Sequence, residues 1–117
     1  MRYVDGYVIP VPKNNLKTYA RMAGMGAKMW MKYGALDYKE CVADDLQTKW
    51  GTPFSRMMKL KPGETVVFSY IVFRSRAHRD RVNAKVMAEM ENMGGPQTMP
   101  FDVKRMVYGG FKVLVEA

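Results

Sequence analysis

The 117-residue sequence contains one cysteine, one histidine and no long apolar run. Because Cys41 has no second cysteine to pair with, an internal disulfide is excluded and a reducing compartment is favoured. One histidine without clustered cysteines does not make a structural metal site, so we expect no metal and no cofactor. No stretch approaches the roughly 20 apolar residues that span a bilayer, and the first residues lack the apolar stretch of an export signal. We therefore expect a cytoplasmic protein without a membrane segment.

Acidic residues are also few, with 11 against 19 basic residues and a net charge of +8. The excess is uneven: residues 1–34 balance at +5, residues 35–73 at zero and residues 74–117 at +3. A basic surface attracts polyanions, so nucleic acid is one class of partner to consider. Solubility alone is a simpler explanation of the same charge.

The first half of the chain predicts a strand followed by a helix. Residues 3–12 are rich in β-branched and aromatic side chains, which favours a strand. Apolar positions then recur at helical spacing from Leu16 to Tyr33. We expect Asn14 or Asn15 to cap the start of this helix, and Gly34 to end it.

The second half repeats this pattern. Ser75 is expected to cap a helix that continues to about Met93, before the helix-breaking run Gly94-Gly95-Pro96. A loop at 45–63, with a short structured piece near 54–58, is expected between a strand at 35–44 and a strand at 64–73. The chain predicts three further strands, at 35–44, 64–73 and 105–115.

Two successive βαβ halves predict a single α+β domain over residues 1–117. The expected architecture is ferredoxin-like βαββαβ, with an antiparallel four-stranded sheet and two helices on one face. The strands are apolar on both faces, and residues 64–73 show this most clearly. Since two helices cover only one face, we expect a second copy of the sheet to cover the other, giving a homodimer.

Several blocks of sequence resemble a known family. They are residues 3–8 with Val11-Pro12, 34–36 with Glu40-Cys41 and Asp44-Asp45, 66–70, Ser75 with Arg79-Asp80, and the long run 99–111. The chain is identified on these as a member of the YbaA-like family, domain of unknown function 1428. The resemblance implies a dimeric α/β-barrel fold and no established activity, although some relatives carry a name that refers to signal recognition particle RNA. This chain departs from familiar members in being basic and in the spacing of its loop at 45–58.

Polar residues within apolar strands are the candidate site. Asp5, Glu40 and Tyr108 are candidates for catalysis, and Ser69 and Arg105 for ligand binding. If these side chains share a cavity between sheet and helices, they could bind a small polar group, with a carboxylate as general base. Alternation along the strands does not say whether Asp5 and Glu40 share a face. The competing interpretation is that each carboxylate pairs with a basic residue, such as Arg105 or Lys104, and only stabilises the fold or the dimer.

Two further residues, His78 and Cys41, have side chains that can carry chemistry. His78 is placed in the first turn of the second helix, where we expect an exposed side chain, although haem-degrading proteins of the same superfamily use a helix histidine as an iron ligand. Cys41 has no base or positive field beside it in the sequence, so a half-buried structural thiol is expected.

The first helix carries a basic stripe, Lys17, Arg21, Lys28 and Lys32, at spacings of four, seven and four. Such a stripe could follow a phosphate backbone, but no aromatic platform or glycine-rich phosphate loop accompanies it. Three hypotheses follow. The chain is a dimeric barrel that binds a small organic ligand, an RNA- or polyanion-binding module, or a structural or stress-related dimer without catalysis.

Overall fold

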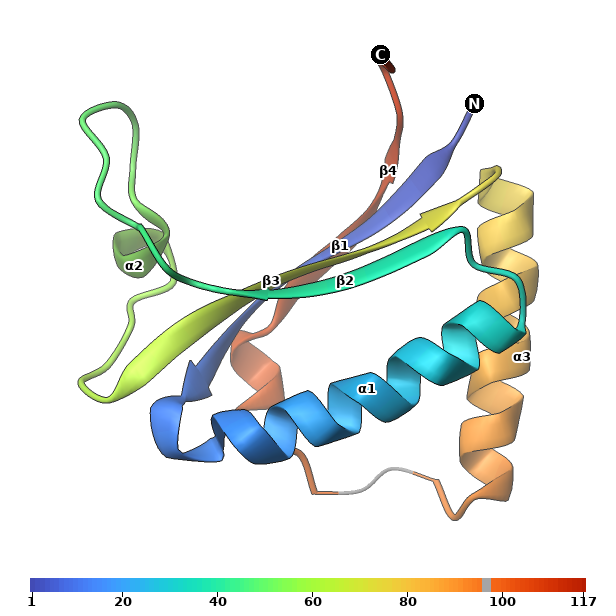
Figure 1. Cartoon of the computed structure of the whole chain (residues 1–117), viewed down its shortest axis with the longest axis horizontal. Helices are drawn as coiled ribbons and strands as arrows, with labels where there is room; N and C mark the ends of the chain where they lie inside the picture. The colour runs from blue at the N-terminus through green and yellow to red at the C-terminus, as the bar shows by residue number, and fades with distance from the viewer. Residues whose placement is uncertain (96–97) are drawn as a thin grey trace.

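A computed structural model describes residues 1–95 and 98–117 of the chain. Four strands form one antiparallel sheet in the order β2-β3-β1-β4 (Figure 1). Their bounds are Tyr3–Pro12 for β1, Asp37–Val42 for β2, Glu64–Phe73 for β3 and Val107–Lys112 for β4. The predicted α+β class and the ferredoxin-like order of elements are confirmed.

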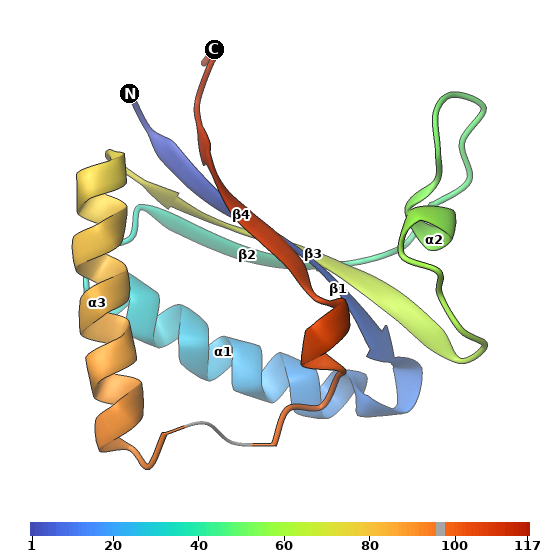
Figure 2. The same ribbon diagram turned by 180° about the vertical axis from the view of Figure 1, so that it is seen from behind.

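The two long helices lie on one side of this sheet. These are α1 (Leu16–Lys32) and α3 (Arg76–Asn92), whereas the short α2 (Phe54–Met57) lies on the opposite side with the loop that leads to it (Figures 1 and 2). Short 3-10 turns, η1 (Lys13–Asn15) and η2 (Val103–Arg105), precede α1 and β4. We call the side covered by α1 and α3 the helix face and the other the open face.

Strands β2 and β4 are shorter than predicted, because a strand extends only where a neighbour pairs with it. The partner of β4 is β1, which begins at Tyr3 opposite Lys112, so residues after Lys112 have no ladder to join. Residues 103–105 form η2 instead, whose turn is held by the Asp102 carboxylate accepting from the Lys104 N–H at 3.0 Å.

One predicted helix cap is confirmed and one is wrong. The Ser75 hydroxyl accepts from the His78 N–H at 3.1 Å and begins α3. Asn15 precedes α1 without a side-chain cap, since η1 leads into the helix and the Asn15 amide donates instead to the Pro100 carbonyl at 3.0 Å. Gly34 ends α1 with φ of +111°. Gly94 and Gly95 follow α3, while Pro96 lies outside the described residues.

The core lies between the helix face and the two helices, in two clusters. One gathers Phe73, Ile71, Val82 and Val86 beside α3, and the other packs Ile9, Val11 and Val67 against Tyr19 and Ala23 of α1. On the open face, Phe68, Val107 and Phe111 are 46%, 55% and 62% exposed. The described residues therefore leave part of an apolar sheet face uncovered, whereas Pro10 and Val66 of the same face are buried.

Candidate functional site

The register of the sheet brings four polar side chains into one row across the helix face. Glu40 of β2 lies opposite Ser69 of β3, Ser69 lies opposite Tyr7 of β1, and Tyr7 lies opposite Tyr108 of β4. Asp5 points to the same side from the neighbouring row, opposite Ile71. Asp5 and Glu40 therefore share a face, which alternation along single strands could not show.

Glu40 is held by two tyrosine hydroxyls. Tyr19, from α1, donates to Oε1 at 2.7 Å, and Tyr38, two residues earlier on β2, donates to Oε2 at 2.7 Å. Burial, followed by these bonds to Glu40, raises the pKa of both phenols. Both hydroxyls therefore stay protonated and fix the carboxylate in one orientation, with lone pairs left for a ligand.

Glu40 lines an open pocket between α1 and β2 with a volume of about 420 Å³. Its walls are mainly small or apolar side chains: Leu16, Ala20, Ala23, Gly24, Ala27, Val42 and Val67. The small residues of α1 leave space on that side of the pocket, and a Cβ added at Gly24 would meet no atom within 4 Å. The pocket is thus apolar in character with one anionic group and two phenols.

Asp5 belongs to a network that joins three elements. The residue is 5% exposed, and its carboxylate accepts from the Asn83 amide at 3.2 Å and lies 3.6 Å from Arg79 Nε. The Asn83 oxygen accepts in turn from Trp30 Nε1 at 2.9 Å, which links β1 and α3 to α1. Burial raises the pKa of Asp5, although Asn83 and Arg79 oppose the rise. The network suits a role in holding the helices on the sheet.

Tyr7 is a site residue that the sequence analysis did not select. Its ring stacks on Tyr108 with centroids 5.7 Å apart and planes at 15°. Burial, and then the neighbouring Asp5 carboxylate, raises the pKa of Tyr7 to about 12. The signal was present in the sequence, because Tyr7 alternates with Asp5 along β1. Tyr108 itself is 67% exposed on the edge strand, and Ser69 is buried within the row.

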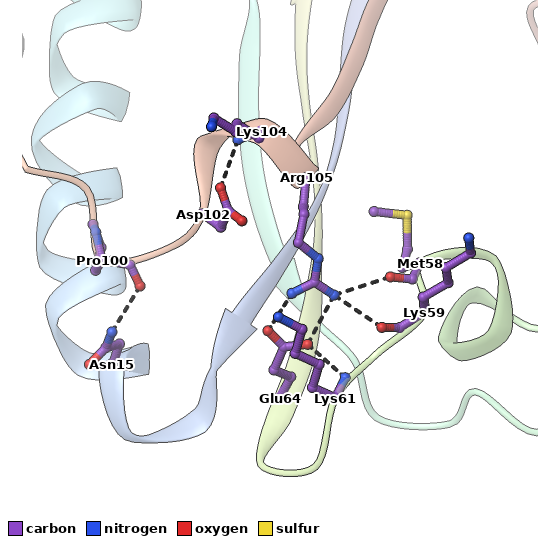
Figure 3. Close-up of polar contacts among 9 residues, drawn as sticks. All are labelled: Asn15, Met58, Lys59, Lys61, Glu64, Pro100, Asp102, Lys104 and Arg105. Atoms are coloured by element: carbon purple, nitrogen blue, oxygen red, sulfur yellow. Dashed lines mark hydrogen bonds and ion pairs between the residues drawn. The ribbon is translucent and has the colours of Figure 1, made fainter.

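Arg105 does not reach the helix-face row. Its guanidinium forms a two-bond ion pair with Glu64 at 2.6 and 3.0 Å and donates to the carbonyls of Met58 and Lys59 (Figure 3). This pairing lowers the pKa of Glu64. Arg105 therefore fastens η2 to the turn before β3. The interpretation that each site carboxylate pairs with a basic residue such as Arg105 or Lys104 is confirmed for Asp5, whose basic partner is Arg79 instead. It is wrong for Glu40, which two tyrosines contact.

His78 and Cys41 also differ from expectation. His78 is only 5% exposed: its Nδ1 accepts from the Arg74 N–H at 3.0 Å, and its ring packs edge-on against Phe73. The first turn of α3 faces the end of the sheet, so this position is covered. Cys41 is exposed rather than half-buried, because it points to the open face of an edge strand.

The basic stripe of α1 is exposed to solvent at Lys17, Arg21, Lys28 and Lys32. The Lys32 ammonium lies 2.7 Å from the Glu89 carboxylate, so one of the four charges already has a partner. A further open pocket of about 480 Å³, lined by Lys13 and Lys61 among others, contains none of the predicted site residues.

Residues 1–95 and 98–117 contain no group of three or more metal-ligating side chains. No helix in this part of the chain is long and apolar enough to cross a membrane.

Comparison with known proteins agrees with the resemblance in sequence. Residues 2–103 match the model of the family described as a protein of unknown function (DUF1428). The chain is 39% identical over 116 residues to the uncharacterized protein YbaA of Escherichia coli K12 and to that of Shigella flexneri, covering 99% of both chains in each case. Among solved structures, a de novo designed protein, Foldit4, matches 99% of the chain with a TM-score of 0.45 and 9% identity. On the family match and the identity across almost its whole length, the chain belongs to the DUF1428 family of proteins of unknown function.

Proposed function

We propose that the protein is a homodimer that binds a small, largely apolar organic molecule in the pocket between α1 and β2. The observation that carries this proposal is the Glu40 carboxylate, which Tyr19 and Tyr38 hold at the wall of an otherwise apolar pocket. A few oriented polar groups in an apolar concavity are the usual composition of a small-molecule site.

The chemistry of Glu40 selects the polar group of the ligand. A carboxylate only accepts hydrogen bonds, so the ligand must offer a donor. Within the described residues, no lysine, arginine or histidine forms a salt bridge with Glu40. An ammonium group would therefore supply the missing countercharge and form the stronger, charge-assisted bond. The favoured ligand is a small hydrophobic amine.

A thermal-shift screen of hydrophobic amines, matched with their uncharged alcohol analogues, tests this site. We expect amines to raise the melting temperature of the wild type and to lose this effect in Glu40→Gln and in Gly24→Leu, which fills the pocket. Asp5→Asn is the matched control, because Asp5 does not line the pocket, and it should respond like the wild type. If no compound stabilises the wild type, or if Glu40→Gln responds equally, the site is refuted.

The second part of the proposal concerns the open face. Phe68, Val107 and Phe111 are about half exposed there, and on α2 beside them Phe54 and Met57 are 40% and 53% exposed. Together they offer roughly 500 Å² of apolar surface per subunit. The open-face positions of β1, β3 and β4 between Val4 and Pro10, Val66 and Val72, and Val107 and Phe111 carry no charge. On the same face the edge strand β2 adds Asp37 and Lys39, which form an ion pair with one another. A second copy of this largely apolar face is the occupant that fits it.

Sedimentation equilibrium distinguishes the 13.4 kDa monomer from a dimer of twice that mass. We expect a dimer at micromolar concentration for the wild type and a monomer for Phe111→Glu. Phe111 alone would contribute about 3 kcal/mol per subunit on burial, and a buried carboxylate adds a further penalty. Lys28→Glu, on the solvent side of α1, is the control and should remain dimeric. A monomeric wild type contradicts the proposal.

A further inference from the structure

The polar end of the pocket between α1 and β2 consists of three side chains. The Glu40 carboxylate lies between the hydroxyls of Tyr19 and Tyr38, and each hydroxyl donates its proton to it at 2.7 Å. All three residues line the pocket, and the side chains of its other lining residues are apolar. Once a hydroxyl has donated its proton, its oxygen can only accept. The side chains of the pocket therefore offer hydrogen-bond acceptors and no free donor.

The rings of the two tyrosines pack against other aromatic side chains. Tyr19 meets Phe101 edge-on, with ring centroids 5.8 Å apart, and Tyr38 lies against Trp30, with ring centroids 6.0 Å apart. A cage for a quaternary ammonium places the cation over aromatic faces. Here the hydroxyl ends of both rings meet the carboxylate. A cation bound to Glu40 therefore lies beside two phenol oxygens.

We propose that the pocket selects primary amines over N-methylated ones, because the three hydrogens of a primary ammonium match the acceptors of Glu40, Tyr19 and Tyr38. This inference rests on the proposed function and narrows the ligand class of the same pocket. One N–H bonds to the carboxylate, and the other two bond to the phenol oxygens on either side of it. Each methyl group on the nitrogen removes one donor and leaves one of these acceptors without a partner.

The expected order of affinities is the reverse of that for a site that recognises only charge and apolar surface. Each added methyl group buries more apolar surface, which by itself strengthens binding about fourfold. An acceptor left unpaired in the pocket weakens binding about tenfold. We therefore expect the affinity to fall by about two- to threefold with each methyl group on the nitrogen, in spite of the added apolar surface.

Isothermal titration calorimetry with amines of one chain length measures this order. Hexylamine is compared with its N-methyl, N,N-dimethyl and N,N,N-trimethyl derivatives, all of which are cations near pH 7. The matched control ligand is 2-aminoheptane, an isomer of N-methylhexylamine that carries the extra methyl group on carbon and keeps three N–H groups. We expect 2-aminoheptane to bind about tenfold more tightly than N-methylhexylamine. If the trimethyl derivative binds as tightly as hexylamine, or if the two isomers bind equally, the inference is overturned.

Tyr19→Phe and Tyr38→Phe each remove one acceptor and test whether the phenol oxygens cause the selection. In either variant we expect the ratio between the affinities of the two isomers to fall from about tenfold towards one. The ratio is the readout, because a freed lone pair on Glu40 affects both isomers alike. Tyr33→Phe is the matched control, since the Tyr33 hydroxyl donates to Glu89 at 2.6 Å outside the pocket. A wild-type ratio in both pocket variants contradicts the inference.

The outcomes separate this inference from the proposed function. If hexylamine binds the wild type and not Glu40→Gln, but methylation of its nitrogen does not weaken binding, the amine site stands and the selection of primary amines is wrong. If hexylamine does not bind, or binds Glu40→Gln equally well, the proposed ligand site and this inference fail together. The comparison of the two isomers on the wild type decides the inference even where a tyrosine variant does not fold.

Discussion

Replacing His78 by leucine should remove a specific part of the pH dependence of stability. The imidazole is buried and its Nδ1 accepts from the Arg74 N–H, so it is held neutral with its proton on Nε2. Protonation would turn Nδ1 into a donor facing a donor. Burial lowers the pKa of His78, and the positive charges of Arg74 and Arg81 lower it further. The folded state therefore opposes protonation of His78 more than the unfolded chain does.

The linkage between protonation and folding gives the sign and size of this pH dependence. Because the pKa of His78 is lower in the folded state, its contribution to the free energy of unfolding is complete above the unfolded value near 6.5. The contribution is lost as the pH falls below that value, by at most about 1.4 kcal/mol per pH unit. His78→Leu does not titrate, but it leaves the Arg74 N–H without its acceptor, which costs about 1–3 kcal/mol.

Urea unfolding at pH 8, 7, 6 and 5 provides the assay. We expect the wild type to be more stable than His78→Leu at pH 8 and the two curves to converge as the pH falls. His78→Asn is the control, because its side-chain oxygen can replace Nδ1 as acceptor without titrating. Asp5, whose pKa is raised, acts in the opposite direction but is present in all three proteins. A difference between wild type and His78→Leu that stays constant with pH would refute the reasoning.

Three further predictions concern packing and ion pairs, and each is measured by urea or thermal unfolding. Gly24→Ala should raise stability by about 1 kcal/mol, since alanine is the better helix former and nothing lies within 4 Å of its Cβ; a loss would mean that α1 packs more closely there. Gly110→Ala should instead lose about 1 kcal/mol, because its Cβ would meet the Tyr3 hydroxyl and lie 2.8 Å from Arg79 Nη2, whose bond to Tyr3 must then break; unchanged stability would contradict this. Arg105→Lys should reduce the loss of stability as the pH falls below 4.5, because the bond to the Arg105 guanidinium is the main cause of the lowered pKa of Glu64. If the stability below pH 4.5 falls as steeply in the variant as in the wild type, the result argues against this pairing.

The fold was predictable because its central strands carry a strong local signal. The predicted ranges 3–12 and 64–73 coincide with β1 and β3, whose β-branched and aromatic residues form strands wherever they pair. The ends of β2 and β4 were not predictable from their own residues: β4 ends opposite the start of β1, whereas β2 ends at Val42 although β3 continues to Glu64.

Some residues of the candidate site could be predicted from the sequence, but their common face and their partners could not. Asp5 and Glu40 stood out as charges within apolar strands, but their common face follows from the register of both β1 and β2 against β3. The partners that come from helices were missed: Tyr19 bonds to Glu40 across 21 residues, and Asn83 bonds to Asp5 across 78. Contacts of that separation depend on the tertiary fold, which composition and periodicity do not specify.

The strand order has a consequence for how the chain matures. Strand β1 is made first and lies inside the sheet, yet one of its two neighbours, β4, is the last strand to be synthesised. Until residues 107–112 emerge from the ribosome, one edge of β1 keeps its N–H and C=O groups without partners, and such edges readily pair with other chains. A nascent chain stalled before β4 would therefore present a ready template for aggregation. Full-length synthesis closes that template in its final step.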